Sequence, residues 1–301
     1  MGSLFKQIYR YTRPRTFRHN ESLWPYTQIE RADTGEIARL RYKGREVAIE
    51  NLSALKDSAE GTVLLTATGP STQSIDFSKL PCTIPVMGVN GAWFLSGKVT
   101  FSLYVIVDME FFDRRQDVIR SVIADPNILL FTTMHGIAKI LDRHAADLRC
   151  RLALIEDACY KIYQPKVADA LKWEMYKSVP GASFCETRQD ICFSTDIRHG
   201  IFDAGTVAYW ALQILFYLGF NKIVITGLDM SNFNQPRFYE TSDSKLPSYL
   251  EEKVDNVVMP SFAHAATVMK KNHIEIVNLS PESAIPDTIF HKVAFDEYFD
   301  L

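Results

Sequence analysis

Short apolar runs that end in glycine or polar residues dominate the pattern of this chain after its first sixty residues. Residues 62–66 include Val63, Leu64 and Leu65, a run too short for a helix, and Gly69 follows closely. Residues 84–89 form a second such run, which ends at Asn90. Runs of this length bounded by turn residues predict buried strands that end in tight loops.

Further apolar runs alternate with segments of helical periodicity. We expect strands at residues 103–107, 128–132, 222–226 and 274–278, and helices at residues 115–124, 135–149, 205–218 and 261–271. This alternation predicts an α/β fold with a mostly parallel sheet and helices on both faces. The continuous apolarity of residues 205–226, broken only around Gly219, places the strand at 222–226 near the centre of the sheet.

Three segments do not follow this alternation. Residues 1–60 are polar and charge-rich, with a turn at Lys43-Gly44-Arg45 between residues 37–42 and 46–49, which predicts an N-terminal extension containing a hairpin. Residues 61–301 then form the main domain. Within it we expect lids at about residues 150–195, of helical type, and at 232–255, which is polar and rich in aromatic residues.

Composition and charge narrow the function classes. The 301 residues are 47% hydrophobic and carry a net charge of -3, with a pI near 6.2, so nothing in the whole molecule favours nucleic-acid binding. Residues 1–18 contain five basic residues and no acid, interleaved with aromatic and aliphatic ones. This stretch fits either the anionic surface of a membrane or a solvated basic tail.

The chain has no apolar run near the roughly 20 residues that a transmembrane helix requires, and no signal-peptide core. We therefore expect a cytoplasmic protein. Its five scattered cysteines show no metal-binding spacing, and we expect reduced thiols.

Small and polar residues at the predicted strand ends are candidates for one nucleotide site, because ligands of open α/β sheets bind at the carboxyl ends of the strands. The candidates are Gly69, Ser71, Asn90 and Gly91. The loop around Gly69 is neither the GxGxxG fingerprint nor a Walker loop, which disfavours NAD and ATP. Taken alone, the loop is better explained as an ordinary turn between a strand and a helix.

Asp108 and Glu110, at the end of the third predicted strand, resemble the acidic pair that binds a metal and a nucleotide diphosphate in many glycosyltransferases. A helix N-cap is an equally good explanation, and we assign no metal. Asp108 is one candidate general base, and the histidines, among them His264 near the start of a predicted helix, are the others.

The segment after the strand at 222–226 combines Asp229 and Ser231 with Arg237 and Tyr239. Arginine and a phenol are suited to binding a departing phosphate, particularly where no metal does so. The competing interpretation is a surface ion pair between Arg237 and Glu240.

Several motifs together resemble a known family. They are Val107-Asp108 with Arg114-Arg115, Asp196-Ile197 with Gly200 and Thr206, Gly227-Leu228-Asp229 with Arg237-Phe238-Tyr239, Leu246-Pro247-Ser248, and Asn278-Leu279-Ser280-Pro281. The chain resembles the bacterial sialyltransferases that use CMP-sialic acid. It is more closely similar to the WaaZ-like proteins of the lipopolysaccharide inner core, regarded as transferases of 3-deoxy-manno-octulosonic acid (Kdo).

The resemblance implies a modified GT-A or Rossmann-like sheet and an inverting, metal-independent transferase that needs no cofactor and uses a CMP-activated ulosonic acid as its donor substrate. It implies that the loop after Asp229 holds the phosphate, where Ser231 and Arg237 roughly replace two tyrosines of the sialyltransferases. The implied donor site comprises Thr68, Gly69, Pro70, Ser71, Asn90, Gly91, Gly205, Thr206, Asp229 and Ser231. The catalytic histidine of the sialyltransferases has no aligned residue, which leaves Asp108 and His264 as candidate catalytic residues.

The leading hypothesis is a transferase of Kdo from CMP-Kdo to the inner core of lipopolysaccharide, peripheral on the cytoplasmic face of the inner membrane. The alternatives are a sialyltransferase, a transferase of another nonulosonic acid, and a non-catalytic CMP-binding protein. A nicotinamide oxidoreductase is the weakest alternative. The expected partners are CMP-Kdo, a lipid A-core acceptor and the membrane surface, not nucleic acid, and a homo-oligomer is left open.

Overall fold

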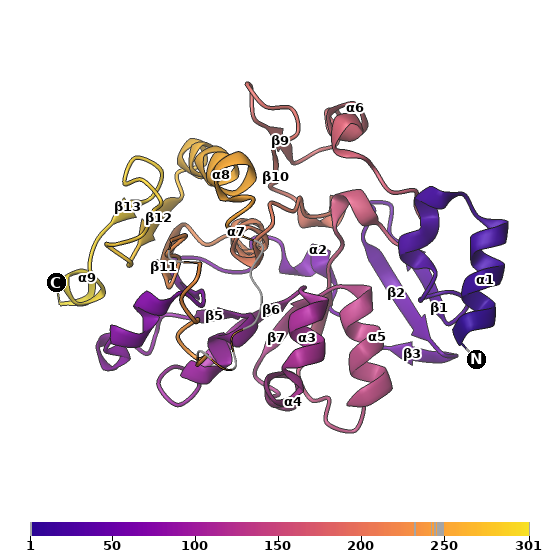
Figure 1. The fold of residues 1–301 in the computed structure, drawn as a ribbon, viewed down its shortest axis with the longest axis horizontal. Coiled ribbons are helices and arrows are strands. Elements are labelled where there is room, and N and C mark those ends of the chain that lie inside the picture. Colours follow the sequence, from indigo (N-terminus) through magenta and orange to yellow (C-terminus); the bar gives the residue numbers. More distant parts are fainter. Residues whose placement is uncertain (1, 232, 242, 244, 246–249, 301) are drawn as a thin grey trace.

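A parallel sheet forms the centre of the molecule in a computed structural model that describes residues 2–231, 233–241, 243, 245 and 250–300 (Figure 1). Within this part of the chain, eight strands pair in parallel. In spatial order they are β13 (His291–Lys292), β12 (Glu275–Asn278), β11 (Lys222–Thr226), β4 (Thr62–Thr66), β5 (Val86–Val89), β6 (Phe101–Ile106), β7 (Leu129–Thr132) and β8 (Arg151–Leu154). The predicted α/β class and the interior position of β11 are confirmed.

Helices cover both faces of the sheet. On one face lie α7 (Val207–Leu218) and α8 (Met259–Lys271), and on the other α3 (Met109–Arg114), α4 (Gln116–Ala124) and α5 (Met134–Arg143) (Figure 1). Val63 and Leu65 of β4 pack toward the first layer and Leu64 toward the second, so the strand is apolar on both sides. This double burial explains why the strands are short continuous apolar runs without polar alternation.

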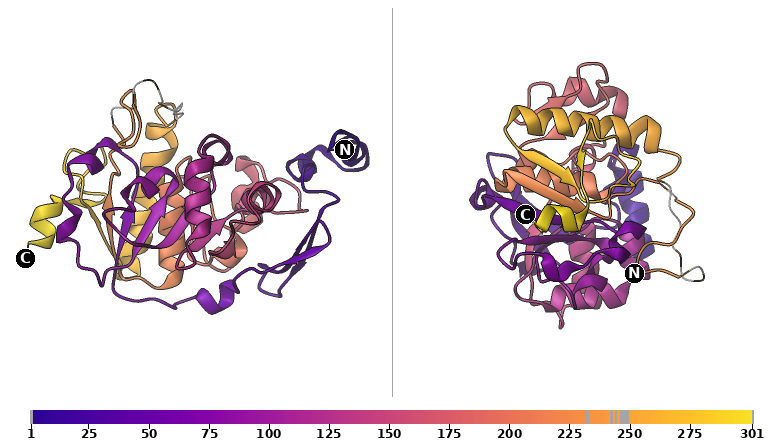
Figure 2. Two further views of the ribbon diagram at one scale, coloured as in Figure 1. Left: turned by 90° about the horizontal axis from the view of Figure 1, so that it is seen from below. Right: turned by 90° about the vertical axis from the view of Figure 1, so that its left-hand side faces the viewer.

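The elements from α1 to β3 form a small layer at one end of the molecule (Figure 2). They are α1 (Gly2–Thr12), the 3₁₀ turn η1 (Arg15–Asn20), and an antiparallel sheet of β1 (Thr27–Arg31), β2 (Ile37–Tyr42) and β3 (Arg45–Val47). The short helix α2 (Leu52–Leu55) follows and packs on α7, where the hydroxyl of Tyr217 donates to the carbonyl of Leu52 at 2.7 Å. The predicted hairpin is confirmed as β2 and β3. Arg31 pairs with Glu156, 2.6 Å from Nη1 to Oε2, and so ties this layer to the main domain.

The segment expected to be a helical lid, residues 150–195, differs from that prediction. It begins with β8 of the main sheet and continues through the 3₁₀ turns η5 (Ala158–Tyr160) and η6 (Asp169–Leu171), α6 (Lys172–Tyr176), and the hairpin of β9 (Ala182–Phe184) and β10 (Cys192–Ser194). A single short helix lies within it. Sequence alone missed β8 because its three buried residues are too few to show a period.

Other differences are local. The helix expected at residues 135–149 ends at Arg143, because the backbone N–H groups of Arg149 and Cys150 instead bind the carbonyl of Ile123. Several short turns and a terminal helix complete the fold. They are η2 (Pro70–Ser74), η3 (Phe77–Lys79), η4 (Asn90–Leu95), η7 (Ile197–His199), the π turn η8 (Val254–Val258) and α9 (Phe295–Phe299).

All five cysteines are free thiols, as expected, and Cys150, Cys159 and Cys192 are buried. In the part of the chain that the structure describes, no helix combines the length and apolarity required to cross a bilayer.

Candidate active site

A cavity of about 310 Å³ opens at the carboxyl ends of the central strands. The chain builds the sheet outward from β4 through β5 to β8, and then returns to place β11 on the other side of β4. The strand order therefore reverses between β4 and β11, and the crevice at such a reversal is where α/β sheets bind ligands. Among the residues predicted from sequence, the cavity is lined by Thr68, Gly69, Pro70, Asn90, Asp108, Gly205, Thr206, Asp229, Ser231, Arg237 and Tyr239.

The loops after β4 and β11 are bound to each other. The carboxylate of Asp229 accepts a hydrogen bond from the backbone N–H of Ser71 at 2.9 Å and another from its hydroxyl. The N–H of Gly69 donates to the carbonyl of Gly227 at 2.8 Å. A Cβ on Gly69 would lie 2.4 Å from Oδ2 of Asp229, so glycine is required there by the close approach of the two loops.

Ser71 consequently supports the wall of the cavity and does not line it. Its hydroxyl lies 2.9 Å from that of Ser280, which in turn accepts the N–H of Gly227 at 3.2 Å. The Asn278-Leu279-Ser280-Pro281 motif, which follows β12, therefore contributes to the same network.

Asn90 has two features typical of a ligand-binding residue. Its φ is +46°, in the left-handed region, and its backbone carbonyl accepts the hydroxyl of the buried Tyr104 at 2.6 Å. Its side-chain Oδ1 is buried without a hydrogen-bond partner. Because leaving a buried acceptor unpaired costs free energy, an unpaired amide oxygen in a cavity wall indicates a place for a ligand donor.

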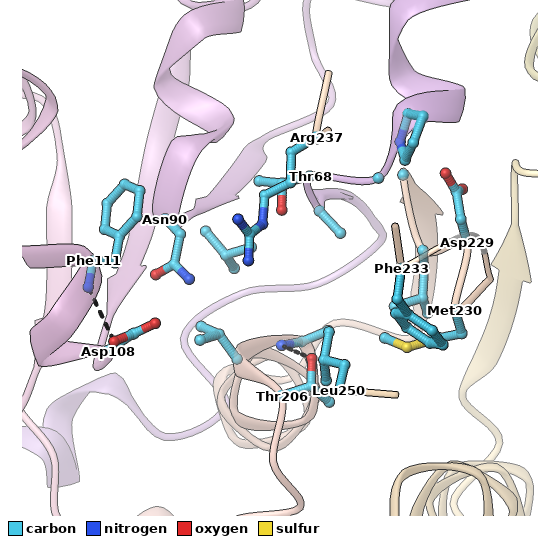
Figure 3. A pocket seen from close by; sticks show the side chains of 18 of the residues that line it. Thr68, Asn90, Asp108, Phe111, Thr206, Asp229, Met230, Phe233, Arg237 and Leu250 are labelled. Atoms are coloured by element: carbon cyan, nitrogen blue, oxygen red, sulfur yellow. Dashed lines mark hydrogen bonds between the residues drawn. The ribbon is translucent and has the colours of Figure 1, made fainter. Parts of the chain in front are cut away.

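Asp108 occupies the opening of the cavity, at the end of β6. It is the N-cap of α3, where Oδ1 accepts the N–H groups of Glu110 at 2.9 Å and Phe111 at 3.1 Å (Figure 3). The N-cap interpretation from sequence is thus correct in geometry. These two bonds fix the side chain and leave Oδ2 toward the cavity that Asp108 lines.

The start of α7 forms the facing wall. Gly205 has a φ of +77°, and the hydroxyl of Thr206 caps the helix by accepting the N–H of Ala208 at 3.4 Å. The partial positive charge of a helix N-terminus faces the cavity at this point and favours an anionic ligand.

Arg237 projects into the cavity between Asn90 on one side and Asp229 on the other (Figure 3). Its Nη1 lies 2.7 Å from Oε1 of Glu240, whose side chain is only 1% exposed. The ion pair weighed from sequence is therefore present, but it lies in the cavity wall and not on the surface. A buried carboxylate of this kind fixes the direction of the guanidinium group.

Tyr239 lines the cavity and is held by a stack of side chains. Its ring is parallel to that of Phe94, with 5.1 Å between centroids, and the guanidinium of Arg115 lies over both rings. A Cβ on Gly91 would lie 2.0 Å from the Tyr239 ring, so Gly91 provides space and does not itself line the cavity. Burial raises the pKa of Tyr239 to about 12, so its phenol remains a hydrogen-bond donor at neutral pH.

His264, the second candidate base, does not line the cavity. It lies in α8, where burial lowers its pKa, and its Nε2 is 2.7 Å from the backbone carbonyl oxygen of Ser183 in β9. This hydrogen bond joins α8 to the small hairpin, which is a structural arrangement.

Some lining residues were not recognised from sequence. Met230, with a φ of +48°, and Phe233 follow β11, whereas Phe111 and Arg114 come from α3. Arg114 was visible within a family motif without a role. Of the expected lid at 232–255, several described residues line the cavity, whereas Asn232 and the Leu246-Pro247-Ser248 motif lie outside the described residues.

No group of three or more His, Cys, Asp or Glu side chains is arranged to hold a metal ion within the described ranges. The lining residues are instead amide, hydroxyl, carboxylate and guanidinium groups around an apolar floor.

The family and the relatives that match this chain are described as the same kind of transferase. The family model described as 3-deoxy-D-manno-octulosonic acid transferase WaaZ matches residues 46–295. A probable 3-deoxy-manno-octulosonic acid transferase of Salmonella typhimurium is 27% identical over 255 residues, which cover 81% of this chain and 91% of the relative. A protein of the same description from Escherichia coli K12 is 25% identical, covering 79% of this chain and 83% of the relative.

Among solved structures, the sialyltransferase CstII of Campylobacter jejuni in complex with cytidine-5'-monophosphate is 14% identical, with a TM-score of 0.42. The match covers 75% of this chain and 86% of that one. A likeness at this score carries no argument about the site.

Proposed function

The chain belongs to the family of the 3-deoxy-D-manno-octulosonic acid transferase WaaZ, and we propose that it transfers Kdo from CMP-Kdo to a sugar hydroxyl of the lipopolysaccharide inner core. Membership of this family, which was expected from the sequence, makes the chain a glycosyltransferase. The donor, the acceptor and the mechanism are what we propose in addition.

One observation carries the proposal: three groups with complementary chemistry converge on the cavity at the strand-order reversal. They are the unpaired amide oxygen of Asn90, the oriented carboxylate of Asp108 and the guanidinium group of Arg237. Transfer from a CMP-activated sugar requires a group that binds the donor, a base for the acceptor hydroxyl and a cation for the departing phosphate.

The nucleotide is bound by the loop after β4, by Asn90 and by the start of α7. Gly69 and Pro70 bring backbone close to the ligand, and Oδ1 of Asn90 accepts a hydrogen bond from a donor group of the substrate. Gly205 and Thr206 present the helix N-terminus to an anionic oxygen. Ser71 acts indirectly, by holding Asp229.

The departing CMP is stabilised by Arg237 and Tyr239. As the bond between the anomeric carbon and the phosphate oxygen breaks, its electron pair and the negative charge pass to the phosphate. The guanidinium of Arg237, held by Glu240, neutralises this charge, and the protonated phenol of Tyr239 donates a hydrogen bond to it. A cation and a hydrogen-bond donor in these positions perform the task that a divalent metal performs in other transferases.

Asp108 accepts the proton of the acceptor hydroxyl. The hydroxyl oxygen attacks the anomeric carbon on the face opposite the departing phosphate, so the configuration inverts, and the proton passes to Oδ2 of Asp108. His264 has no part in this step, since it lies outside the cavity.

The proposed acceptor is anchored in a membrane, so the enzyme has to reach the membrane surface. Phe5 and Tyr9 of α1 pack on Trp24, with ring centroids 6.0 and 5.8 Å away, and anchor the helix to the protein. Leu4, Ile8 and Tyr11 remain exposed on α1, beside the basic residues of positions 1–18. A helix with exposed apolar and cationic side chains suits the surface of an anionic leaflet. We propose a peripheral position on the cytoplasmic face of the inner membrane.

The test of the transfer reaction is CMP release by the purified protein. CMP-Kdo, generated in situ, and CMP-sialic acid are each supplied with and without a truncated lipid acceptor that contains Kdo. Release that requires both CMP-Kdo and the acceptor is expected. Release from CMP-sialic acid instead would reassign the donor, and CMP binding without release from either would indicate a non-catalytic protein.

The test of the membrane surface uses liposome sedimentation. Removal of residues 1–18, and separately the triple change Lys6→Glu, Arg13→Glu and Arg15→Glu, is expected to weaken binding to anionic vesicles but to leave activity on a soluble acceptor. The charge-matched control carries Lys98→Glu, Lys270→Glu and Lys271→Glu. Equal vesicle binding by the native chain and both variants would contradict this part of the proposal.

A further inference from the structure

Lys253 lines the cavity but has no role in the proposed reaction. It follows β11 by some 27 residues along the chain and lines the cavity beside the start of α7. Its aliphatic stem lies over Gly205, where an added Cβ would be 3.2 Å from Cδ of the lysine. The glycine thus allows the lysine to approach the helix N-terminus closely.

An irregular turn of backbone fixes this position. The carbonyl of Lys253 accepts the N–H of Val257 at 2.8 Å and that of Val258 at 3.1 Å, which opens the π turn η8 directly before α8. Val254 and Val258 are buried and anchor the turn in the core. π turns are rare and occur frequently at functional sites, where they redirect one side chain.

The charge of Lys253 is available to a ligand. Of the three other cationic residues that line the cavity, Arg114, Arg237 and Lys245, the two arginines have acidic partners: Arg114 pairs with Glu110 at 2.8 Å and Arg237 with Glu240 at 2.7 Å. Lys253 has no ion pair with any residue the structure describes. An ammonium group beside a helix N-terminus adds to the positive potential there and attracts an anionic ligand.

We propose that Lys253 is a donor-binding residue whose ammonium group holds an anionic oxygen of the CMP-activated ulosonic acid. That oxygen belongs either to the phosphodiester or to the sugar carboxylate, which share the chemistry that a lysine recognises. The proposal rests on the proposed function, and it adds a residue that neither the sequence motifs nor the reaction scheme identifies.

The experiment compares Lys253→Met, which keeps the stem over Gly205 and removes the charge, with Lys253→Arg, which keeps the charge. Lys270→Met, an exposed lysine near the end of α8 outside the cavity, is the matched control. Calorimetric titration with CMP and with uncharged cytidine is combined with the KM for CMP-Kdo and with kcat.

We expect Lys253→Met to weaken anion recognition about 10-fold or more, with a smaller loss for Lys253→Arg and none for the control. Weaker binding of both CMP and CMP-Kdo would assign the lysine to the phosphate. A raised KM for CMP-Kdo with unchanged CMP affinity would assign it to the carboxylate. Cytidine binding should not change in either case.

Failure of the proposed function and failure of the proposed role of Lys253 give different results. If the native protein binds neither CMP nor CMP-Kdo, the proposed function fails. If the native protein binds them and Lys253→Met binds both equally well, only the role of Lys253 is overturned. A change confined to kcat, with KM and CMP affinity intact, would also overturn it as a donor-binding residue.

Discussion

Asp229 and Ser71 lie 158 positions apart in the chain, yet the carboxylate of Asp229 accepts both the backbone N–H and the hydroxyl of Ser71. The bond from the N–H is 2.9 Å long. This pair closes the junction between β4 and β11, the two strands at which the sheet reverses its order. The shape of the cavity wall therefore depends on one contact between distant segments.

Ser71→Ala should reduce stability and donor affinity together. The variant loses the hydroxyl bonds to Asp229 and Ser280, and we expect an unfolding free energy lower by about 1 kcal/mol. Chemical denaturation and CMP titration measure the two effects. Ser121→Ala, an exposed serine of α4, is the control and should change neither. A Ser71→Ala protein with native stability and affinity would show that the junction is not sensitive to this contact.

Asp108→Asn should abolish the base and keep the fold. Asparagine still caps α3 by accepting the N–H groups of Glu110 and Phe111, so stability should change little. We expect kcat to fall by roughly 10²-fold to 10⁴-fold with CMP affinity retained. Asp113→Asn, an exposed residue of the same helix that does not line the cavity, serves as control. An undiminished kcat in the Asp108 variant would exclude the carboxylate as the base.

Arg237→Gln should lower both kcat and stability, because it removes the ion-pair partner of a buried glutamate. Loss of a hydrogen bond to a charged group of this kind lowers the unfolding free energy by about 2 kcal/mol. The double variant with Glu240→Gln should recover much of the stability and none of the activity. Recovery of kcat in the double variant would assign Arg237 a structural role alone.

Gly91→Ala should disturb the site through Tyr239. The new methyl group would lie 2.0 Å from the ring, which must leave its stack with Phe94. We expect kcat/KM to fall by about 10-fold or more, consistent with loss of one positioned hydrogen-bond donor and its aromatic contact. Gly97→Ala is the control, since no atom lies within 4 Å of the position of its Cβ. Equal effects of the two substitutions would contradict a role for Tyr239.

His264→Asn should affect stability but leave kcat within about twofold. Burial lowers the pKa of the folded histidine below the ordinary 6.5, so its contribution to stability is present above pH 6.5 and is lost as the pH falls. The difference in unfolding free energy between the native protein and the variant should therefore shrink toward pH 5. A large loss of kcat with a changed pH profile would instead return His264 to the chemistry.

Local sequence was sufficient to predict much of the fold. The apolar runs of β4, β5, β7 and β11, and the apolar helix α7, were recognisable because burial on both sides demands unbroken apolar residues. β8 and the hairpin of β9 and β10 were not, because β8 begins with an exposed arginine that shortens its apolar run to three residues, and the two strands of the hairpin are only three residues long.

The candidate site, like the fold, was predictable from the sequence only in part. The sequence by itself determined that polar and small residues end the strands, and so identified Gly69, Asn90, Asp108 and Asp229, because a chain leaving a sheet needs turn and capping residues. Only the tertiary structure decided which of these ends meet. Strand order, and with it the position of β11 beside β4, results from contacts between segments far apart in the chain.

Three side chains illustrate the reason. Tertiary packing buries Glu240 beside Arg237 in the cavity wall, removes His264 from the cavity and brings Lys253 to the start of α7. Residue type and spacing carry no information about such distances. They are fixed only when helices and loops pack on the completed sheet, because close packing leaves each side chain few places to lie.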